Sequence, residues 1–317
     1  MENQIKKDFL GQLKQMSFTL FILLSVIIGM CFPQYFQEIG GLKMTKLIVP
    51  LLQLIMFSMG TEMSLKDFEG VFKTPKPVLI GLVCHFTIMP LVGIALATGF
   101  GFEAEIAAGV VLIGCVPSEV ASNVLAFIAK GNMPLSVTIA AVSTMIAPFA
   151  TPFLMQLLAG QFIDIDFMAM MIHVVEIIIA PIILGLIVNK LFKNAMKNIK
   201  SIMPKVSMFG ILMVILIIVA SGRDGLLKIG PLLFLSSIIH HSLGYFLGYW
   251  SGRLCKLDEA TCRTISIEVG MQNAGLASGI ALQMGKVATV GLASAIAAPW
   301  MSISGSVLAN WWRGKPV

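Results

Sequence analysis

Charged residues are scarce in this sequence. Asp, Glu, Lys and Arg make up 12% of its 317 residues and hydrophobic residues make up 57%, whereas soluble domains have roughly 25% charged residues. No hydrophilic stretch long enough for a soluble domain separates the apolar runs. The chain is therefore predicted to lie almost wholly within a membrane.

Sequence motifs of hydrolytic and intramembrane enzymes are also absent. The chain contains no His-Glu-x-x-His and no Gly-x-Ser-x-Gly, and no Asp lies inside a predicted span. An intramembrane protease or metal-dependent transferase is therefore the weaker interpretation. The five cysteines are scattered without metal-binding spacing, which favours a role in packing. We expect that the protein is not an enzyme.

Apolar runs of about twenty residues recur along the chain, and each can cross a hydrocarbon core of about 30 Å. The runs are continuous and do not alternate, so they predict helices and not barrel strands. We expect an all-α polytopic membrane protein with ten transmembrane helices. The predicted spans are residues 16–33, 45–63, 76–98, 104–129, 134–158, 167–191, 203–221, 229–252, 260–284 and 288–311.

Basic residues are distributed unequally between the two ends of these spans. With the N-terminus in the cytoplasm, all but five of the 22 Lys and Arg residues fall on the inner side, as the positive-inside rule requires. Anionic inner-leaflet lipid then accounts for the net charge of +6 without nucleic acid. We expect a multi-pass protein of the cell inner membrane, with both termini cytoplasmic and no obligatory protein partner. The five outer residues are Lys43, Lys46, Arg223, Lys228 and Lys286.

Two distant parts of the chain share a motif spacing. Asn123 is followed by Pro148 after 25 residues, and Asn273 is followed by Pro299 after 26 residues. The spacing predicts two copies of a five-span unit. Because five is odd, the second copy enters the membrane in the opposite orientation, which gives an inverted repeat. The two copies would be residues 1–160 and residues 161–317.

Polar and helix-breaking residues interrupt the fourth and ninth predicted spans. Glu268 places a carboxylate at membrane depth, where charge is costly and usually functional. Broken helices at matching positions of two halves are typical of a transporter site. Freed carbonyls and carboxylates are ligands for a hard cation, and helix N-termini attract an anion. The interrupting residues are Gly114, Pro117, Ser118, Glu119, Ser122 and Asn123, and then Glu268, Gly270, Gln272, Asn273 and Gly275.

Motifs at both interruptions are specific enough to compare with known families, in particular Ala121-Ser122-Asn123-Val124 and Glu268-Val269-Gly270-Met271-Gln272-Asn273. They resemble the bile acid:sodium symporter family, in its bacterial branch, and the resemblance covers nearly the whole chain. It implies a panel (spans 1, 2, 6 and 7) and a core (spans 3–5 and 8–10), with spans 4 and 9 crossing where they unwind. It also implies alternating-access transport of an organic anion, such as a bile acid, pantoate or a keto acid, driven by sodium.

The resemblance further implies two sodium sites that share one carboxylate, so that their occupancies depend on each other. Oxygen ligands of this kind suit a hard cation. The first site would use Ser122, Asn123, Ser136 and Glu268. The second would use Glu268, Gln272, the carbonyls of Val269 and Met271, and the position of His85. The solute would contact Asn123, Asn273, Glu119, Val120 and Ser302.

This sequence departs from the family pattern at several of these positions. Ala140 stands where the family offers a second hydroxyl, and His85 stands where it offers a Gln. Imidazole is a poor sodium ligand, so we expect either one or two sodium ions. Glu119 would repel an anion unless it is protonated or paired, and the family's substrates therefore do not transfer directly. A proton-coupled or cation-independent transporter of a different organic solute stays open as an alternative.

Overall fold

The computed structural model describes residues 20–64, 68, 70–191 and 202–317. Several sequence predictions fall outside these residues, namely the start of the first span (16–19), the cytoplasmic N-terminus, and the inner-side assignment of Lys6, Lys7, Lys14, Lys66, Lys193, Lys197 and Lys200. The described chain is helical apart from one small hairpin.

Six helical segments in the described residues are long and apolar enough to cross a membrane. This supports a polytopic membrane protein, while the ten spans and the inverted repeat stay predictions. Three of them are single helices, namely α5 (Pro75–Gly99), α13 (Arg223–Leu254) and α16 (Gly291–Arg313). The other three combine shorter elements. Met44–Glu62 consists of η1 (Met44–Leu47) and α3 (Ile48–Glu62), Met133–Ala159 consists of α8 (Met133–Leu154) and η3 (Met155–Ala159), and Phe167–Leu191 consists of α9 (Phe167–Val174), η4 (Val175–Ile179) and α10 (Ala180–Leu191).

The remaining apolar helices are Leu20–Cys31, α6 (Ala104–Cys115), α12 (Met203–Ser221, of which Lys205–Ser221 is the apolar segment) and α15 (Ala274–Gln283). The others are α2 (Gln34–Gln37), α4 (Gly70–Lys73), α7 (Ala121–Ile128) and α14 (Glu259–Gly270).

A two-stranded hairpin, which the sequence analysis did not anticipate, follows α2. Its strands β1 (Glu38–Ile39) and β2 (Leu42–Lys43) pair antiparallel. Gly40 and Gly41 form the turn with φ of 58° and 83°, values that glycine adopts without steric cost. The hairpin turns the chain between the helix Leu20–Cys31 and α3.

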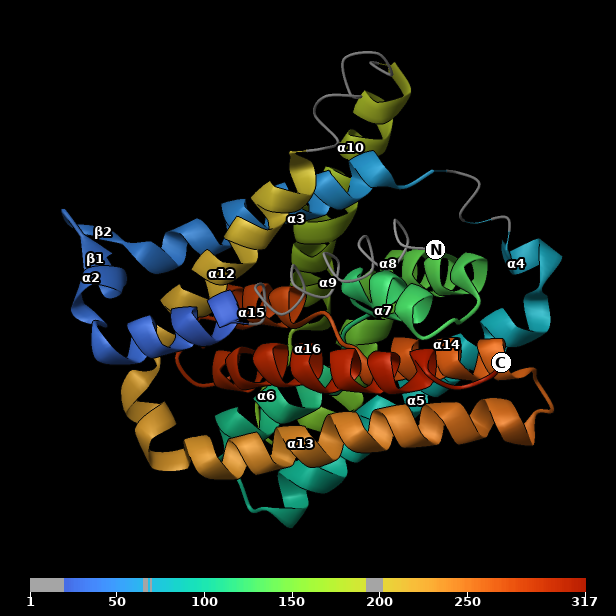
Figure 1. The fold of residues 1–317 in the computed structure, drawn as a ribbon. Helices are drawn as coiled ribbons and strands as arrows, with labels where there is room; N and C mark the ends of the chain where they lie inside the picture. Colours follow the sequence, from blue (N-terminus) through green and yellow to red (C-terminus); the bar gives the residue numbers. More distant parts are fainter. Residues whose placement is uncertain (1–19, 65–67, 69, 192–201) are drawn as a thin grey trace.

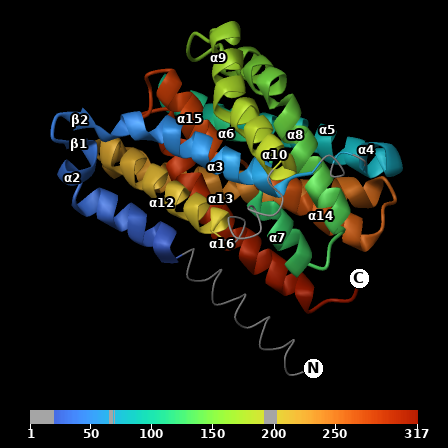
Figure 2. The same ribbon diagram turned by 90° about the horizontal axis from the view of Figure 1, so that it is seen from above.

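The long helices pack in two groups (Figures 1 and 2). In the first, α3 packs against α10 and α12, and Gly29 of the helix Leu20–Cys31 lies close to α12. In the second, α13 packs against α5, α14 and α16, and α6 packs against α5. The assignment of these two groups to a panel and a core stays a prediction. So does the division of the chain into two repeats at residue 160.

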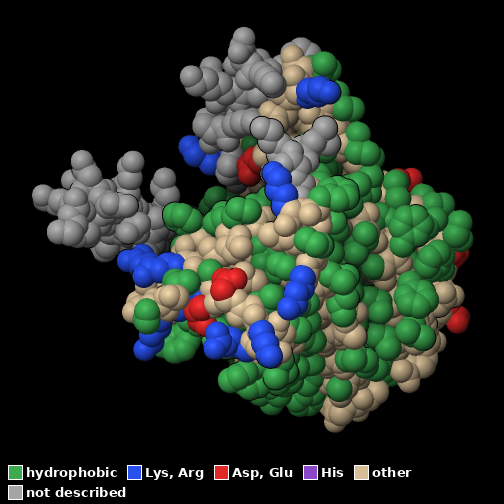
Figure 3. All heavy atoms as spheres, turned by 90° about the vertical axis from the view of Figure 1, so that its right-hand side faces the viewer, with side chains coloured by type: hydrophobic (Ala, Val, Ile, Leu, Met, Phe, Trp, Pro, Cys, Tyr) green, Lys and Arg blue, Asp and Glu red, His purple; other side chains and the backbone are tan. Residues whose placement is uncertain are grey.

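The end of the molecule that carries the C-terminus is rich in exposed basic side chains. Figure 3 views this end and shows Lys and Arg gathered over part of it, with hydrophobic side chains over much of the remainder. A predominantly apolar surface flanking a basic end fits a protein whose sides contact lipid and whose end contacts anionic headgroups. The exposed basic residues that the sequence analysis assigned to the inner side are, among the described residues, Lys73, Lys76, Lys130, Lys190, Lys205, Arg253, Lys256 and Lys315.

Helices α5 and α6 approach closely where α6 nears its end. A Cβ atom at Gly114 would lie 2.4 Å from the carbonyl oxygen of Met89 and 2.9 Å from the backbone nitrogen of Pro90. Because these are backbone atoms, no side-chain rotation can make room. Only glycine at this position permits the observed packing of α6 against α5.

We expect Gly114→Ala to lower the free energy of unfolding by about 3 kcal/mol, since overpacking forces the two helices apart. Thermal denaturation of the purified protein in detergent measures the effect. Gly99→Ala is the matched control, because a Cβ there meets nothing within 4 Å. Equal melting temperatures for the two variants would contradict the close approach.

Candidate cation and solute site

Two helix interruptions meet in the interior. Helix α6 ends at Cys115 and α7 begins at Ala121, while α14 ends at Gly270 and α15 begins at Ala274. Pro117 lacks a backbone N–H and disfavours helical geometry at Val116, which accounts for the first break. The intervening segments pair antiparallel at Ser118 and Gln272. This pairing satisfies backbone groups that the broken helices release.

Backbone hydrogen bonds fix the crossing. The N–H of Asn273 donates to the carbonyl of Pro117 at 2.8 Å, and the N–H of Glu119 donates to the carbonyl of Met271 at 3.4 Å. Gly270 permits close packing beside the crossing, because a Cβ there would lie 2.1 Å from the Tyr245 ring. The two interruptions therefore form one local structure, with side chains from both halves of the chain.

The carboxylate of Glu268 lies beside this crossing and is fully buried. Ser118 Oγ donates to its Oε2 at 2.6 Å, Ser122 Oγ donates to its Oε1 at 2.7 Å, and Ser136 Oγ also contacts Oε1. All the partners described for this carboxylate are neutral hydroxyls. A buried carboxylate is expensive unless it is paired, so the site is suited to a cation.

Oxygen contacts at the Glu268 carboxylate outnumber the available hydrogens. Ser122 Oγ lies 2.6 Å from the carbonyl oxygen of Glu119 as well as 2.7 Å from Glu268 Oε1. Ser136 Oγ lies 2.7 Å from Asn123 Oδ1 as well as beside Glu268 Oε1. Each hydroxyl has one proton, and the Asn123 amide can present either its oxygen or its nitrogen to Ser136, so at least one of these four contacts brings two oxygens together without a hydrogen between them. The geometry brings together all four residues predicted for the first site.

The residues predicted for the second site lie at the end of α14. Gln272 donates its Nε2 to the carbonyl of Val269 at 2.8 Å, and the carbonyl of Met271 accepts from Glu119. Within the described part of the chain, Gln272 Oε1 is buried and has no hydrogen-bond partner. An oxygen of this kind is available for a cation, and the carbonyls of Val269 and Met271, each of which accepts one hydrogen bond, have a second lone pair.

His85 is fully buried in α5, and both of its ring nitrogens face backbone carbonyls. Its Nδ1 lies 3.0 Å from the oxygen of Glu268 and its Nε2 lies 2.9 Å from that of Val116. A neutral imidazole has one N–H and can donate to only one of them. His85 therefore connects α5 to both broken helices, and neither of its nitrogens points toward the carbonyls of Val269 or Met271.

The residues predicted to contact the solute lie in different structural settings. Glu119 and Val120 lie partly exposed just before α7, whereas Asn273 Oδ1 accepts from the N–H of Leu276 at 2.9 Å and so caps α15. The Ser302 hydroxyl donates to the carbonyl of Ala298 at 2.9 Å, within α16. The Asn123 side chain and the backbone carbonyl of Glu119 lie at the oxygen cluster around Glu268.

The sequence analysis did not assign Ser118 to the cation site. Its hydroxyl nevertheless contacts Glu268 as closely as the hydroxyl of Ser122 does. The available signal was a small hydroxyl residue directly after Pro117, inside the interruption. His241 was likewise left unassigned, and its Nδ1 lies 2.8 Å from the carbonyl oxygen of Gly270.

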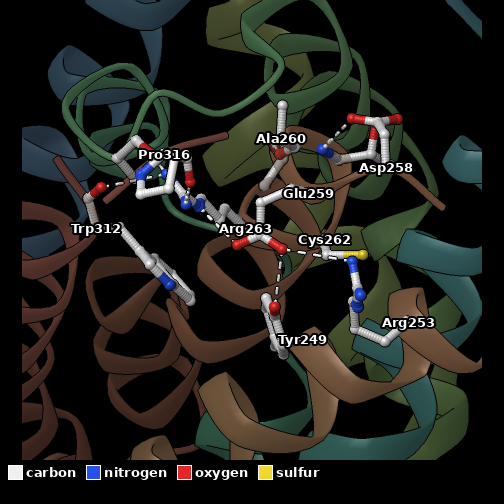
Figure 4. Close-up of polar contacts among 12 residues, drawn as sticks. Tyr249, Arg253, Asp258, Glu259, Ala260, Cys262, Arg263, Trp312 and Pro316 are labelled. Atoms are coloured by element: carbon white, nitrogen blue, oxygen red, sulfur yellow. Dashed lines mark hydrogen bonds and ion pairs between the residues drawn. The ribbon is translucent and has the colours of Figure 1, made fainter. Parts of the chain in front are cut away.

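A second polar cluster, which the sequence analysis did not anticipate, lies where α7 ends and α14 begins, at the ends of these helices farther from the crossing (Figure 4). Arg263 is 1% exposed, and its Nε donates to Glu259 Oε1 at 2.9 Å. Its guanidinium also donates to the carbonyls of Ala129, Trp312 and Pro316. One side chain thereby connects the end of α7, the start of α14 and the C-terminal segment. An Arg inside a predicted span was the signal, because charge at such a position is rare.

Comparison with known proteins gives consistent matches. The sequence model of the Sodium Bile acid symporter family matches residues 49–229. The "Uncharacterized sodium-dependent transporter YocS" of Bacillus subtilis is 37% identical over 307 residues, which cover 97% of this chain and 92% of that protein. The "Probable sodium/metabolite cotransporter BASS1, chloroplastic" of Arabidopsis thaliana is 30% identical, covering 96% and 75%. The "Ileal sodium/bile acid cotransporter" of Oryctolagus cuniculus is 32% identical, covering 77% and 72%.

Proposed function

The chain belongs to the Sodium Bile acid symporter family, and from this premise we propose that it is a secondary active transporter that couples solute movement to sodium. The solute is a small organic anion of the bile acid, pantoate or keto acid type, and it crosses the cell inner membrane. Transport proceeds by alternating access, with the core moving against the panel around the crossing. The relatives' names, which specify sodium and metabolites, support this assignment.

One observation carries the sodium part of the proposal, namely the surplus of close oxygen contacts around Glu268. A sodium ion among these oxygens would make the hydrogen-free contacts favourable and would neutralise the carboxylate. A proton on Glu268 could supply a missing hydrogen, but the oxygens of Ser122, Asn123 and Ser136 around one carboxylate also form a ligand set for a hard cation. This ligand set, together with the sodium named for the relatives, favours sodium over a proton at this carboxylate.

The number of sodium ions is one or two. Ser122, Asn123, Ser136 and Glu268 form the first site, and Ser118 is added to it because its hydroxyl contacts the same carboxylate. The second site would use Glu268, Gln272 and the carbonyls of Val269 and Met271, and the buried Gln272 Oε1, which has no partner in the described residues, supports it. Binding at the two sites is coupled, because both would use Glu268.

The arrangement of the half-helices supports an anionic group on the solute. Both α7 and α15 begin at the crossing, so the positive ends of two helix dipoles lie there. Asn123 at the start of α7 is the proposed solute contact nearest to the cation cluster. A solute carboxylate at this position would lie close to the bound sodium, which would account for coupled binding.

The decisive experiment measures thermal stability of the detergent-purified protein with sodium, potassium or choline as the sole cation. We expect sodium alone to raise the melting temperature, in a saturable manner, and to be required for stabilisation by organic acids. Uptake into proteoliposomes with and without an inward sodium gradient then tests coupling. Identical melting curves in sodium and choline, with uptake independent of sodium, would refute the proposal.

Alanine substitutions should separate the roles of Asn123 and Asn273. Asn123→Ala removes an oxygen from the cation cluster, so the sodium concentration at half-maximal stabilisation should rise about tenfold, equivalent to about 1.4 kcal/mol. Asn273→Ala removes a helix cap and should lower the free energy of unfolding by about 1 kcal/mol. Because Asn273 is also a proposed solute contact, both variants should reduce uptake.

Asn273→Ser is the control for the Asn273 experiment. Serine is a good N-cap and can still accept from Leu276, so this variant should recover the melting temperature. If Asn123→Ala kept a normal sodium midpoint, Asn123 would have to be removed from the first site.

A further inference from the structure

Glu119 is a second carboxylate at the crossing, and no hydrogen bond or ion pair in the described residues accounts for it. It lies one residue after Ser118 and two residues before the start of α7, and its backbone N–H is bonded to Met271 across the crossing. Its Oε2 is buried and has no hydrogen-bond partner within the described part of the chain. Glu119 and Val120 are partly exposed as whole residues, and Ala121 is exposed. A solute that binds Glu119 would approach it from this partly exposed segment.

Nearby donors are directed elsewhere. The hydroxyls of Ser118 and Ser122 contact Glu268, and the hydroxyl of the neighbouring Tyr245 donates to the carbonyl of Met301 at 3.1 Å. Among the ion pairs of the described residues, none involves Glu119. A carboxylate oxygen that is buried without a partner is costly, so its partner should come from the ligand.

Glu119 and Glu268 differ in the partners that contact their carboxylates. Three serine hydroxyls contact Glu268, which is fully buried, and sodium would neutralise it. Glu119 would then remain as the uncompensated negative charge at the crossing. A solute that carried only negative charge would be repelled by it, because like charges this close in a low-dielectric interior interact strongly.

We propose that the transported solute carries a protonated amine that pairs with Glu119, in addition to the carboxylate assigned above. This inference rests on the proposed sodium-coupled transport and keeps the solute carboxylate, but it changes the solute from a net anion to a zwitterionic organic acid, such as a 2-amino acid. The ammonium group supplies donors to the unpartnered carboxylate, and the solute carboxylate faces the half-helix N-termini. The zwitterion thereby adds no net charge to the site.

The test uses straight-chain carboxylic acids of about three to eight carbons, each paired with its 2-amino derivative, at saturating sodium. Thermal stabilisation of the full-length protein is titrated for every compound. We expect at least one amino derivative to act at a concentration about tenfold or more below that of its parent acid. The inference is overturned if no amino derivative surpasses its parent acid, including the case in which none of the compounds stabilises the protein.

Glu119→Gln tests whether the carboxylate causes the preference. This neutral side chain should abolish the advantage of the amino derivatives and should improve binding of the parent acids. If Glu119 instead acts as a neutral hydrogen-bond donor to an anion, the glutamine variant should bind the parent acids as the native protein does, and the inference fails. Glu119→Asp retains the charge and should retain the direction of the preference, which provides a second test if the glutamine variant does not fold.

Glu103→Gln is the matched control, because it makes the same chemical change at an exposed residue just before α6. It should retain the full preference for amino derivatives. Sodium titration without solute distinguishes failure of the proposed function from failure of this inference. A missing sodium response in the native protein refutes the proposed function, whereas a normal sodium response without any preference for the amino group refutes only this inference.

Discussion

Glu268→Gln should abolish stabilisation by sodium while leaving the fold intact. The glutamine side chain has the same shape, its oxygen can still accept from Ser122 and Ser136 and its nitrogen can donate to Ser118, but it has no charge to bind a cation. We expect a loss of at least about 100-fold in sodium affinity, or roughly 3 kcal/mol, as when one partner of a buried charge pair is removed. Sodium-driven uptake should be lost with it.

The melting temperature of Glu268→Gln in choline, without sodium, distinguishes a loss of sodium binding from a loss of folding stability. Without sodium, the native protein buries a carboxylate that only neutral hydroxyls contact, so its removal should leave the melting temperature unchanged or raise it. Glu105→Gln is the control, since it removes a carboxylate paired with Lys286 at the far end of α6. A normal sodium midpoint in Glu268→Gln would exclude this carboxylate from the cation site.

Arg263→Leu should be strongly destabilising, by about 3–5 kcal/mol, because it leaves buried carbonyl oxygens without their donor, at a cost of about 1–3 kcal/mol each. The substitution deprives Glu259 of its closest cation and leaves three carbonyl oxygens without their guanidinium donor. Thermal denaturation in detergent measures the loss. Susceptibility of the C-terminal segment to carboxypeptidase should rise as well, because Trp312 and Pro316 lose the guanidinium that holds them.

Arg253→Leu is the control for Arg263. Arg253 contacts the same Glu259 at 3.5 Å, but its side chain is 46% exposed. An exposed ion pair contributes little, so we expect less than about 1 kcal/mol. Equal losses in the free energy of unfolding for Arg253→Leu and Arg263→Leu would show that the burial of Arg263 does not increase its contribution to stability.

Hydropathy alone was sufficient to identify the class of protein. Scarce charge and recurring apolar runs predicted a helical membrane protein, and six long apolar helices support it. Both helix breaks could be located because Pro117 and the polar residues from Glu268 to Asn273 are incompatible with a continuous apolar helix. The motifs at these breaks also indicated the family, which the comparisons confirm.

Tertiary structure decided which polar groups meet. Ser118 contacts Glu268 from 150 residues away, and Arg263 contacts Trp312 across 49 residues. Hydropathy and helix-breaking tendency are local properties that can be read residue by residue. Hydrogen-bond partnership depends instead on which backbone segments packing brings within about 3 Å of each other. For that reason the sequence by itself determined that Glu268 lies at membrane depth beside a helix break, and only the fold decided that Ser118 shares its site, that Asn273 caps a helix and that Glu119 Oε2 has no partner among the described residues.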